Sequence, residues 1–77
     1  MEAQGFGWAL QELWSGRKVY RVGWNGLGQF IRMQFPSKGT KITLPYIYIS
    51  TKEALLVPWV ASQTDLLAFD WQLVEED

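Results

Sequence analysis

The first sixteen residues of the chain carry apolar side chains at the spacing of an amphipathic helix. Apolar residues recur every three or four positions, at Phe6, Ala9, Leu10, Leu13 and Trp14, and this spacing places them along one face of a helix. Gly16 follows directly, and glycine commonly ends a helix because it adopts a positive φ without steric penalty. The pattern therefore predicts a helix that ends before Gly16 and buries this face.

After Gly16 the pattern changes to that of β-strands. Residues 18–22 form a short run of β-branched and aromatic side chains. Residues 29–35 alternate Ile31, Met33 and Phe35 on one face with Phe30, Arg32 and Gln34 on the other. The segment between them, residues 23–28, is rich in Gly and Asn, which favour turns. These features predict an antiparallel hairpin with a long loop.

The rest of the chain predicts further extended stretches and a short helix. The extended stretches are residues 41–44, 46–50, 55–60 and 70–74, with turns at 36–39 and 51–54. Pro45 lies between the stretches 41–44 and 46–50, which indicates that this part of the chain is an edge strand or contains a β-bulge. Ser62 and Asp65 have the spacing of a helix capping box. We therefore expect a single α+β domain over residues 1–77, with a small antiparallel sheet of about four strands, one main N-terminal helix and a short second helix.

Composition limits the chemistry that the chain can perform. With no Cys and no His among 77 residues, disulfide frameworks, zinc fingers and catalysis by Cys or His are excluded. The five Trp, three Tyr and four Phe are too many for so small a core. We therefore expect some rings to line a ligand site or a subunit interface.

The charges are segregated along the chain. Residues 1–16 contain two acidic residues, residues 17–52 contain all seven cations, and residues 53–77 contain six acidic residues. One interpretation is that the basic middle meets an anion, while the acidic end masks it or contacts a neighbouring subunit. The alternative is that folding mixes the blocks into an ordinary surface of alternating sign.

The segment around Trp24 is the best candidate for ligand binding. Trp24 offers a ring on which a flat base stacks, Asn25 offers hydrogen bonds, and Arg21 and Arg32 flank the loop as partners for phosphate. The alternative is that Trp24 plugs the core. Single-stranded nucleic acid is a poorer match, because the net charge is −1 and the pI is about 5.3.

Catalysis and membrane insertion find little support in the sequence. Asp65 and Asp70 form one nearby carboxylate pair, but Asp65 is better placed to cap a helix, and no nucleophile elbow or phosphate-loop motif is present. No apolar run reaches the roughly 18 residues of a membrane span, and the N-terminus does not resemble a signal peptide. We expect a soluble intracellular protein with no metal or cofactor.

Four segments, in order, resemble the Thoeris anti-defence family of the second type, which consists of small phage and prophage proteins. The segments are FGWALQEL at residues 6–13, KVYRVGWNG at 18–26, LPYIYI at 44–49 and VPWVASQTDLLAFDW at 57–71. They cover nearly the whole chain, and the pattern WxASQTDxLAxDW within the last segment is the most specific.

This resemblance implies a function that composition alone does not indicate. Members of the family act as sponges: they form homo-oligomers, typically tetramers, that sequester a cyclic nucleotide signal of bacterial immunity without degrading it. For Thoeris that signal is a glycocyclic ADP-ribose isomer made by a TIR-domain enzyme, and some relatives also capture cyclic di- or trinucleotides. The resemblance thus implies a non-enzymatic protein in the cytoplasm of the infected bacterial host.

The resemblance also implies roles for individual residues. Those expected to contact the ligand are Arg21, Trp24, Asn25, Gly26, Ser62, Gln63, Thr64 and Asp65. For Ser62 and Asp65, capping of the short helix is at least as good an interpretation as contact with a ligand. Trp59 and Trp71 are expected in the core or at an interface, and Trp8, nearly opposite the apolar helix face, is expected to meet a partner subunit.

Two other functions stay open at this point. A metal-free phosphodiesterase that acts on the same ligand would turn it over. A phage structural or adaptor protein would bind a protein partner through its aromatic surface.

Overall fold

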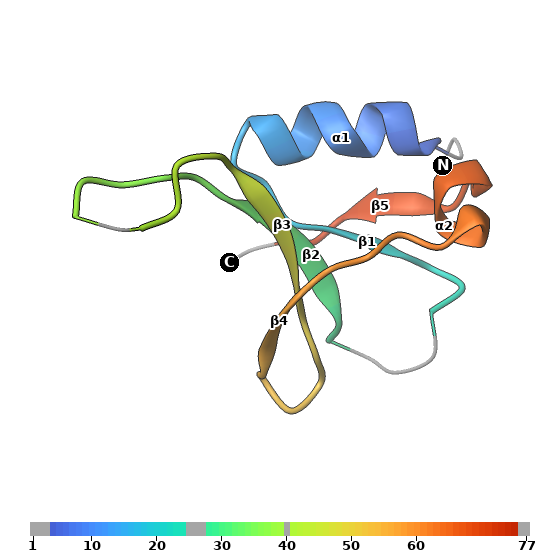
Figure 1. Ribbon diagram of the computed structural model, residues 1–77. Helices are drawn as coiled ribbons and strands as arrows, with labels where there is room; N and C mark the ends of the chain where they lie inside the picture. The colour runs from blue at the N-terminus through green and yellow to red at the C-terminus, as the bar shows by residue number, and fades with distance from the viewer. Residues whose placement is uncertain (1–3, 25–27, 40, 76–77) are drawn as a thin grey trace.

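The computed structural model describes residues 4–24, 28–39 and 41–75, which form one antiparallel sheet and two helices (Figure 1). Along the chain the elements are α1 (Phe6–Trp14), β1 (Val19–Arg21), β2 (Phe30–Gln34), β3 (Tyr46–Ser50), β4 (Leu56–Pro58), α2 (Gln63–Leu67) and β5 (Trp71–Leu73). The strand order is β4-β3-β2-β1-β5, and every neighbouring pair is antiparallel. The predicted α+β class with a long first and a short second helix is confirmed, and the sheet has five strands.

The helix α1 ends where its sequence predicts. Gly16 adopts a φ of +86°, its N–H donates to the carbonyl of Leu13, and the N–H of Arg17 donates to the carbonyl of Glu12. These two bonds form a Schellman motif, which satisfies carbonyl groups that the helix itself leaves without partners. Any other residue at position 16 would be strained by the positive φ.

The buried face of α1 is centred on Ala9 and Leu13, both fully buried. Trp8 and Trp14 each lie about 120° around the helix from the centre of that face. Trp14 is consequently 55% exposed, beside the ring of Phe35, so its predicted place on the buried face is wrong. Trp8 is half-buried and packs against the core, and its contact with a partner subunit stays a prediction.

The predicted hairpin is confirmed by the pairing of β1 with β2, in which Val19 lies opposite Ile31. The alternation within β2 is also confirmed, because Ile31 and Met33 are buried and Arg32 is exposed. It does not extend to Phe35, which follows the end of β2 and is exposed.

The region before β3 differs from the sequence prediction. Residues 41–44 form no strand, and Pro45 immediately precedes β3 instead of interrupting it. Strand β3 is central, since it pairs with both β2 and β4. Proline has no N–H to donate to a ladder, so regular pairing starts only at Tyr46.

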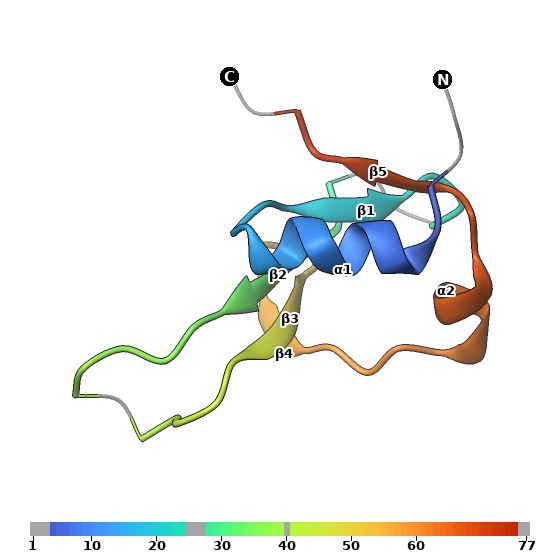
Figure 2. The same ribbon diagram turned by 90° about the horizontal axis from the view of Figure 1, so that it is seen from above.

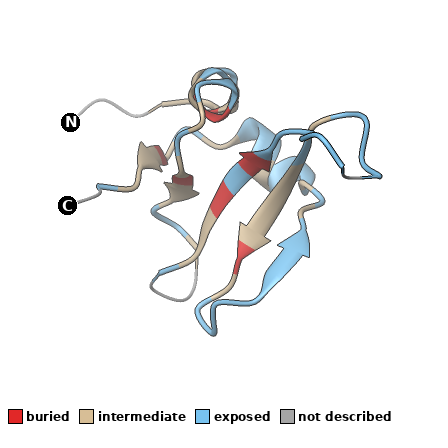
Figure 3. Ribbon diagram, turned by 90° about the vertical axis from the view of Figure 1, so that its left-hand side faces the viewer, coloured by how far each residue is buried: buried red, intermediate tan, exposed pale blue. Residues whose placement is uncertain are grey.

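The buried positions of the chain lie on α1 and on strands of the sheet (Figure 3). A cluster of rings closes the core around Trp71, which is fully buried. The ring centroids of Phe6, Trp24 and Trp59 lie 5.2, 5.4 and 6.1 Å from that of Trp71. Trp24 and Trp59 meet it edge-on, at 81° and 89°, which is a favourable geometry for aromatic pairs. Of the two places predicted for these residues, core or interface, Trp71 lies in the core and Trp59 packs against it while remaining partly exposed. Several of the surplus rings are thus accounted for.

Both helices lie on one face of the sheet. Helix α1 packs on β5, β1 and β2 and touches α2 (Figure 2). The segment 59–70, which includes α2, connects the edge strand β4 to the opposite edge strand β5 on that same side, where Trp59 contacts Phe6 and Trp71. Within the part of the chain that the structure describes, no helix or strand covers the other face.

Truncation of the buried helix face should destabilise the domain. We expect Leu13→Ala to lower the free energy of unfolding by about 3 kcal/mol, because a fully buried leucine leaves a cavity. Urea denaturation followed by tryptophan fluorescence measures this change. Leu44→Ala, at a loop leucine that is largely exposed, is the matched control, and equal losses in the two variants would contradict the packing described here.

Candidate functional site

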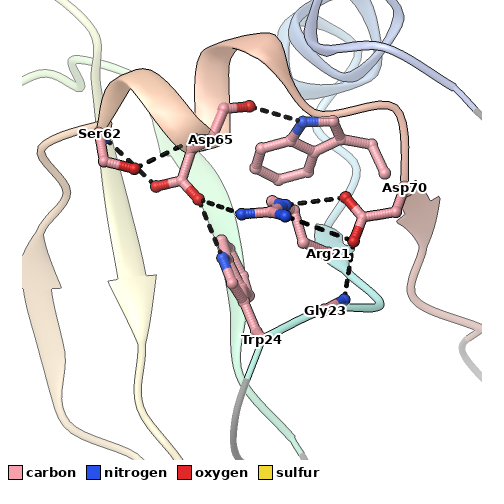
Figure 4. Close-up of polar contacts among 7 residues, drawn as sticks. Arg21, Gly23, Trp24, Ser62, Asp65 and Asp70 are labelled. Carbon is pink, nitrogen blue, oxygen red and sulfur yellow. Dashed lines mark hydrogen bonds and ion pairs between the residues drawn. The ribbon is translucent and has the colours of Figure 1, made fainter.

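Arg21, at the end of β1, lies between two carboxylates that come from the acidic end of the chain (Figure 4). Its Nε donates to Asp70 Oδ1 at 2.8 Å, its Nη2 approaches Asp70 Oδ2 at 3.5 Å, and its Nη1 donates to Asp65 Oδ1 at 2.9 Å. The side chains of Arg21 and Asp65 are only 15% and 13% exposed. All three guanidinium nitrogens are therefore engaged within the protein.

The position of Asp70 follows from the pairing of the strands. Arg21 lies opposite Trp71 in the β1–β5 ladder, and the N–H of Val22 donates to the carbonyl of Asp70 at 3.1 Å. The Asp70 side chain then meets both Arg21 and the N–H of Gly23, which donates to its Oδ2 at 2.8 Å. A Cβ on residue 23 would lie 2.9 Å from that oxygen, so any other residue here would displace the Asp70 carboxylate from this position.

The position of Asp65 follows from the capping box, which is confirmed. Ser62 Oγ accepts the N–H of Asp65 at 3.1 Å, and the N–H of Ser62 donates to Asp65 Oδ2 at 3.3 Å. This reciprocal pair starts α2 and leaves Asp65 Oδ1 facing Arg21. Trp71 Nε1 donates to the Asp65 carbonyl at 3.1 Å, so the helix is also fixed to the core.

Trp24 takes part in the same cluster. Its Nε1 donates to Asp65 Oδ1 at 3.1 Å, and its ring packs edge-on against Trp71. Trp24 therefore packs against the core, which is the structural alternative that the sequence left open for this residue.

Both carboxyl groups are held in their ionised form. The hydrogen bonds from Arg21 lower the pKa of the Asp70 carboxyl, burial opposes this effect, and the N–H of Gly23 lowers the pKa further. Burial alone would raise the pKa of the Asp65 carboxyl, but hydrogen bonds from Arg21 and Trp24 outweigh it and lower that pKa. Hydrogen bonds to the two aspartates raise the pKa of the Arg21 guanidinium. The cluster thus carries two negative charges and one positive charge.

The remaining residues that were predicted to bind a ligand are not part of the hydrogen-bond network described above, or lie outside the described residues. Gln63 and Thr64 are exposed in the first turn of α2, and Asn25 and Gly26 lie outside the described residues. The structure brings Arg21, Trp24, Ser62 and Asp65 together in one network of hydrogen bonds. Their contacts with a ligand stay predictions.

Sequence reasoning did not predict the role of Asp70. It identified Asp70 as the partner of Asp65 in a carboxylate pair, whereas the two aspartates share Arg21. The sequence feature that could have indicated this role is the position of Asp70, a short acidic residue immediately before Trp71. In residues 4–24, 28–39 and 41–75, no three acidic side chains come close enough to hold a metal ion.

Comparison with known proteins identifies the family. Residues 4–74, from the segment before α1 to the end of β5, match the model of the Thoeris anti-defense 2-like domain. The chain belongs to this family. A relative, Thoeris anti-defense 2 of Bacillus phage SP01, is 38% identical over 82 residues, which cover 90% of this chain and 92% of that protein.

Membership in the Thoeris anti-defense 2-like family supports a role in phage anti-defence. None of the helices that the structure describes is long and apolar enough to cross a bilayer.

The network around Arg21 predicts how stability depends on pH. Because the folded pKa values of Asp65 and Asp70 are lowered, their stabilisation is fully present above the unfolded pKa of about 3.9 and is lost as the pH falls through the folded values. We therefore expect the free energy of unfolding to fall steeply below about pH 4. Urea denaturation at a series of acidic pH values measures this dependence.

Arg21→Gln should destabilise the domain by about 3 kcal/mol, because two partly buried carboxylates then face no cation. The same variant should flatten the acid dependence, since its carboxylates no longer gain from remaining ionised. Arg17→Gln is the matched control, because Arg17 is largely exposed and lies 3.8 Å from Glu12. An Arg21→Gln variant with the parent's stability and acid dependence would contradict the role assigned to this network.

Proposed function

We propose that this chain binds and sequesters a cyclic nucleotide signal of bacterial immunity without degrading it. The observation that carries the proposal is membership in the Thoeris anti-defense 2-like family over residues 4–74. The signal would be a glycocyclic ADP-ribose isomer of the Thoeris system, with cyclic di- or trinucleotides as further ligands. The site of action would be the cytoplasm of the infected host, where the captured signal no longer reaches its effector.

The state of the two paired carboxylates favours binding over catalysis. A general acid that works near neutral pH needs a pKa raised toward 7. The pKa values of Asp65 and Asp70 are lowered instead, and both side chains are held by Arg21. This pair is therefore suited to fixing the fold and not to moving protons.

The apolar surface of the second half of the chain favours a homo-oligomer, with a tetramer as the proposed form. Large apolar side chains are exposed around β4 and α2, and they include Leu55, Leu56, Val57, Val60, Leu66, Leu67 and Phe69. Val60 and Leu67 are 88% and 74% exposed. Apolar surface concentrated in this way marks a contact with another protein surface, and a second copy of the chain is the partner proposed here.

Capture of the signal is the direct test of function. The protein is incubated with the product of an activated TIR-domain enzyme, separated from unbound material by gel filtration and heated. Mass spectrometry of the supernatant should then detect the intact cyclic product, because a sponge releases its ligand unchanged when it unfolds. Protein that is heated before the incubation is the control and should carry no product.

Two outcomes would contradict the proposal. Recovery of a hydrolysed product would indicate a phosphodiesterase. Absence of uptake, together with no change in melting temperature on addition of the product, would favour the adaptor that binds a protein partner.

The oligomer has a separate test. Sedimentation velocity should give a multimer for the parent chain, and Val60→Asp combined with Leu67→Glu should shift it toward the monomer, because charges would become buried at the contact. Gln11→Glu, at an exposed position of α1, is the control. A parent chain that sediments as a monomer would contradict the oligomer.

A further inference from the structure

The two edges of the sheet are covered to different degrees. The edge strand β5 is bridged by the segment before α1, because the N–H of Trp71 donates to the carbonyl of Gln4 at 3.1 Å. The other edge strand, β4, pairs with β3, and among the described residues no strand pairs with its outer side. All three residues of β4 are exposed, so it is the strand drawn wholly in pale blue in Figure 3.

Hydrogen bonds at both ends of β4 show which of its backbone groups face β3. The N–H of Thr51 donates to the carbonyl of Leu55, and the N–H of Trp59 donates to the carbonyl of Ile47, each at 2.9 Å. In an antiparallel ladder, bonded and non-bonded positions alternate along the strand. The backbone groups of Leu55, Val57 and Trp59 therefore face β3.

The backbone groups of Leu56 and Pro58 consequently point away from the sheet. Proline has no N–H to donate, and a strand tolerates it at an edge position of this kind because no ladder bond is lost. Leu56 has both an N–H and a carbonyl at the open edge. Such outward groups are a template for pairing with a strand of another chain.

The side chains of this edge are apolar on both faces. Edge strands are commonly protected by charged side chains, but residues 54–60 contain none. Val57 lies opposite Ile49, which packs against the core, so Val57 and Leu55 belong to the face that carries the helices. They are 45% and 61% exposed, and Leu56, on the other face, is 66% exposed. A strand that pairs here should therefore be apolar on both faces as well.

We propose that β4 pairs antiparallel with β4 of a second copy of the chain, about a two-fold axis at Leu56, so that the two sheets join into one. The Leu56 N–H of each copy donates to the Leu56 carbonyl of the other. Leu55 of each copy lies opposite Val57 of the other, and the two Leu56 side chains meet on the opposite face. The inference rests on the proposed function for the existence of an oligomer and names the contact that forms it.

Pro58 selects this register. If the axis passed through Val57 instead, the carbonyl of Leu56 would face the ring of Pro58 from the second copy, which has no N–H to donate. That carbonyl would lie inside the contact, where a polar group without a partner is destabilising. With the axis at Leu56, the carbonyl of Pro58 lies at the end of the short ladder, where water can bond to it.

A second copy is the occupant because the edge is complementary to itself. A two-fold axis brings the same residues together from both sides, so each exposed leucine and valine of the edge meets an apolar side chain. The contact uses the open edge of each copy and leaves the bridged β5 edges outside it, so the pair closes and does not extend into a filament. The apolar segment continues to Val60, which is 88% exposed, and thus joins the surface proposed above for the oligomer.

Cysteine cross-linking tests this contact directly, because the chain has no cysteine of its own. In Leu56→Cys the two thiols lie at the axis, and opposite residues of a bonded pair have Cα atoms about 5.5 Å apart, within the range of a disulfide. Mild oxidation should give a disulfide-linked dimer on a non-reducing gel. In Val57→Cys the two thiols are displaced by two residues, roughly 7 Å, along the strands, and should not join.

Leu44→Cys, at a loop position that is 74% exposed, is the control for random collision and should stay unlinked. Failure of Leu56→Cys to cross-link would overturn the inference, and so would equal cross-linking of all three variants. A cross-link in Val57→Cys but not in Leu56→Cys would overturn the proposed axis.

Removal of the outward N–H provides the second arm. Leu56→Pro deletes both hydrogen bonds of the contact and leaves the ladder to β3 intact, as Pro58 does. The dissociation constant for self-association, measured by sedimentation velocity, should rise about thirtyfold. Leu56→Val, which keeps the N–H, is the matched control and should raise it far less. A Leu56→Pro variant with the parent's circular dichroism spectrum and dissociation constant would overturn the inference, and if this variant does not fold, the cysteine variants decide.

The outcomes separate the inference from the proposed function. A parent that captures the TIR product and sediments as a multimer, without a Leu56→Cys cross-link, would overturn the inference and leave the proposed function standing. A cross-link specific to Leu56→Cys, in a chain that captures no TIR product, would support the inference and contradict sequestration. A parent that captures the product as a monomer would overturn the inference and the oligomer, but not the capture.

Discussion

The salt bridges of Arg21 hold together parts of the chain that would not otherwise stay in place. Helix α2 has five residues, far fewer than the 12–15 or so that an isolated helix needs for even marginal stability in water. Its capping box, the Arg21–Asp65 pair and the bond from Trp71 Nε1 to the Asp65 carbonyl supply the missing support. Arg21 also joins Asp70, directly before β5, so one guanidinium connects the end of β1 to both segments.

The salt bridges of Arg21 also influence which face of the sheet is covered by helices. The segment between β4 and β5 connects the two edges of the sheet, and Arg21 and Trp71 fix it on the side that α1 already occupies. The aromatic cluster of Phe6, Trp24, Trp59 and Trp71 fills the space between them. With both helices committed to one side, the chain has no further element among its described residues to close the other side.

The two interpretations of the segregated charges apply to different residues. Arg21 of the basic middle pairs with Asp65 and Asp70 of the acidic end, so folding does mix the blocks at this point. Lys18 and Arg32 alternate with buried neighbours and lie on the opposite side of the sheet. The net charge of the chain, −1, therefore does not show that cations lie on both sides of one sheet, with Arg21 between two aspartates on one side and Lys18 and Arg32 on the other.

Local patterns in the sequence determined most of the elements. The apolar spacing and Gly16 determined α1 and its end, the alternation around Ile31 determined the two faces of β2, and Ser62 and Asp65 determined the start of α2. These features depend on interactions within a few residues, which a linear pattern displays directly.

The tertiary structure decided what the functional candidates are bonded to. The sequence brought Arg21 and Trp24 forward as partners of a ligand, but Asp65 and Asp70, more than forty positions away, occupy their polar groups in the folded chain. The sequence likewise could not show that Lys18 lies opposite Arg32, because this proximity arises from the register of two strands. Contacts between distant segments depend on how the strands pair and on which side the chain crosses the sheet. No local pattern displays either of these, and here Arg21 and Trp71 hold the crossing segment in place.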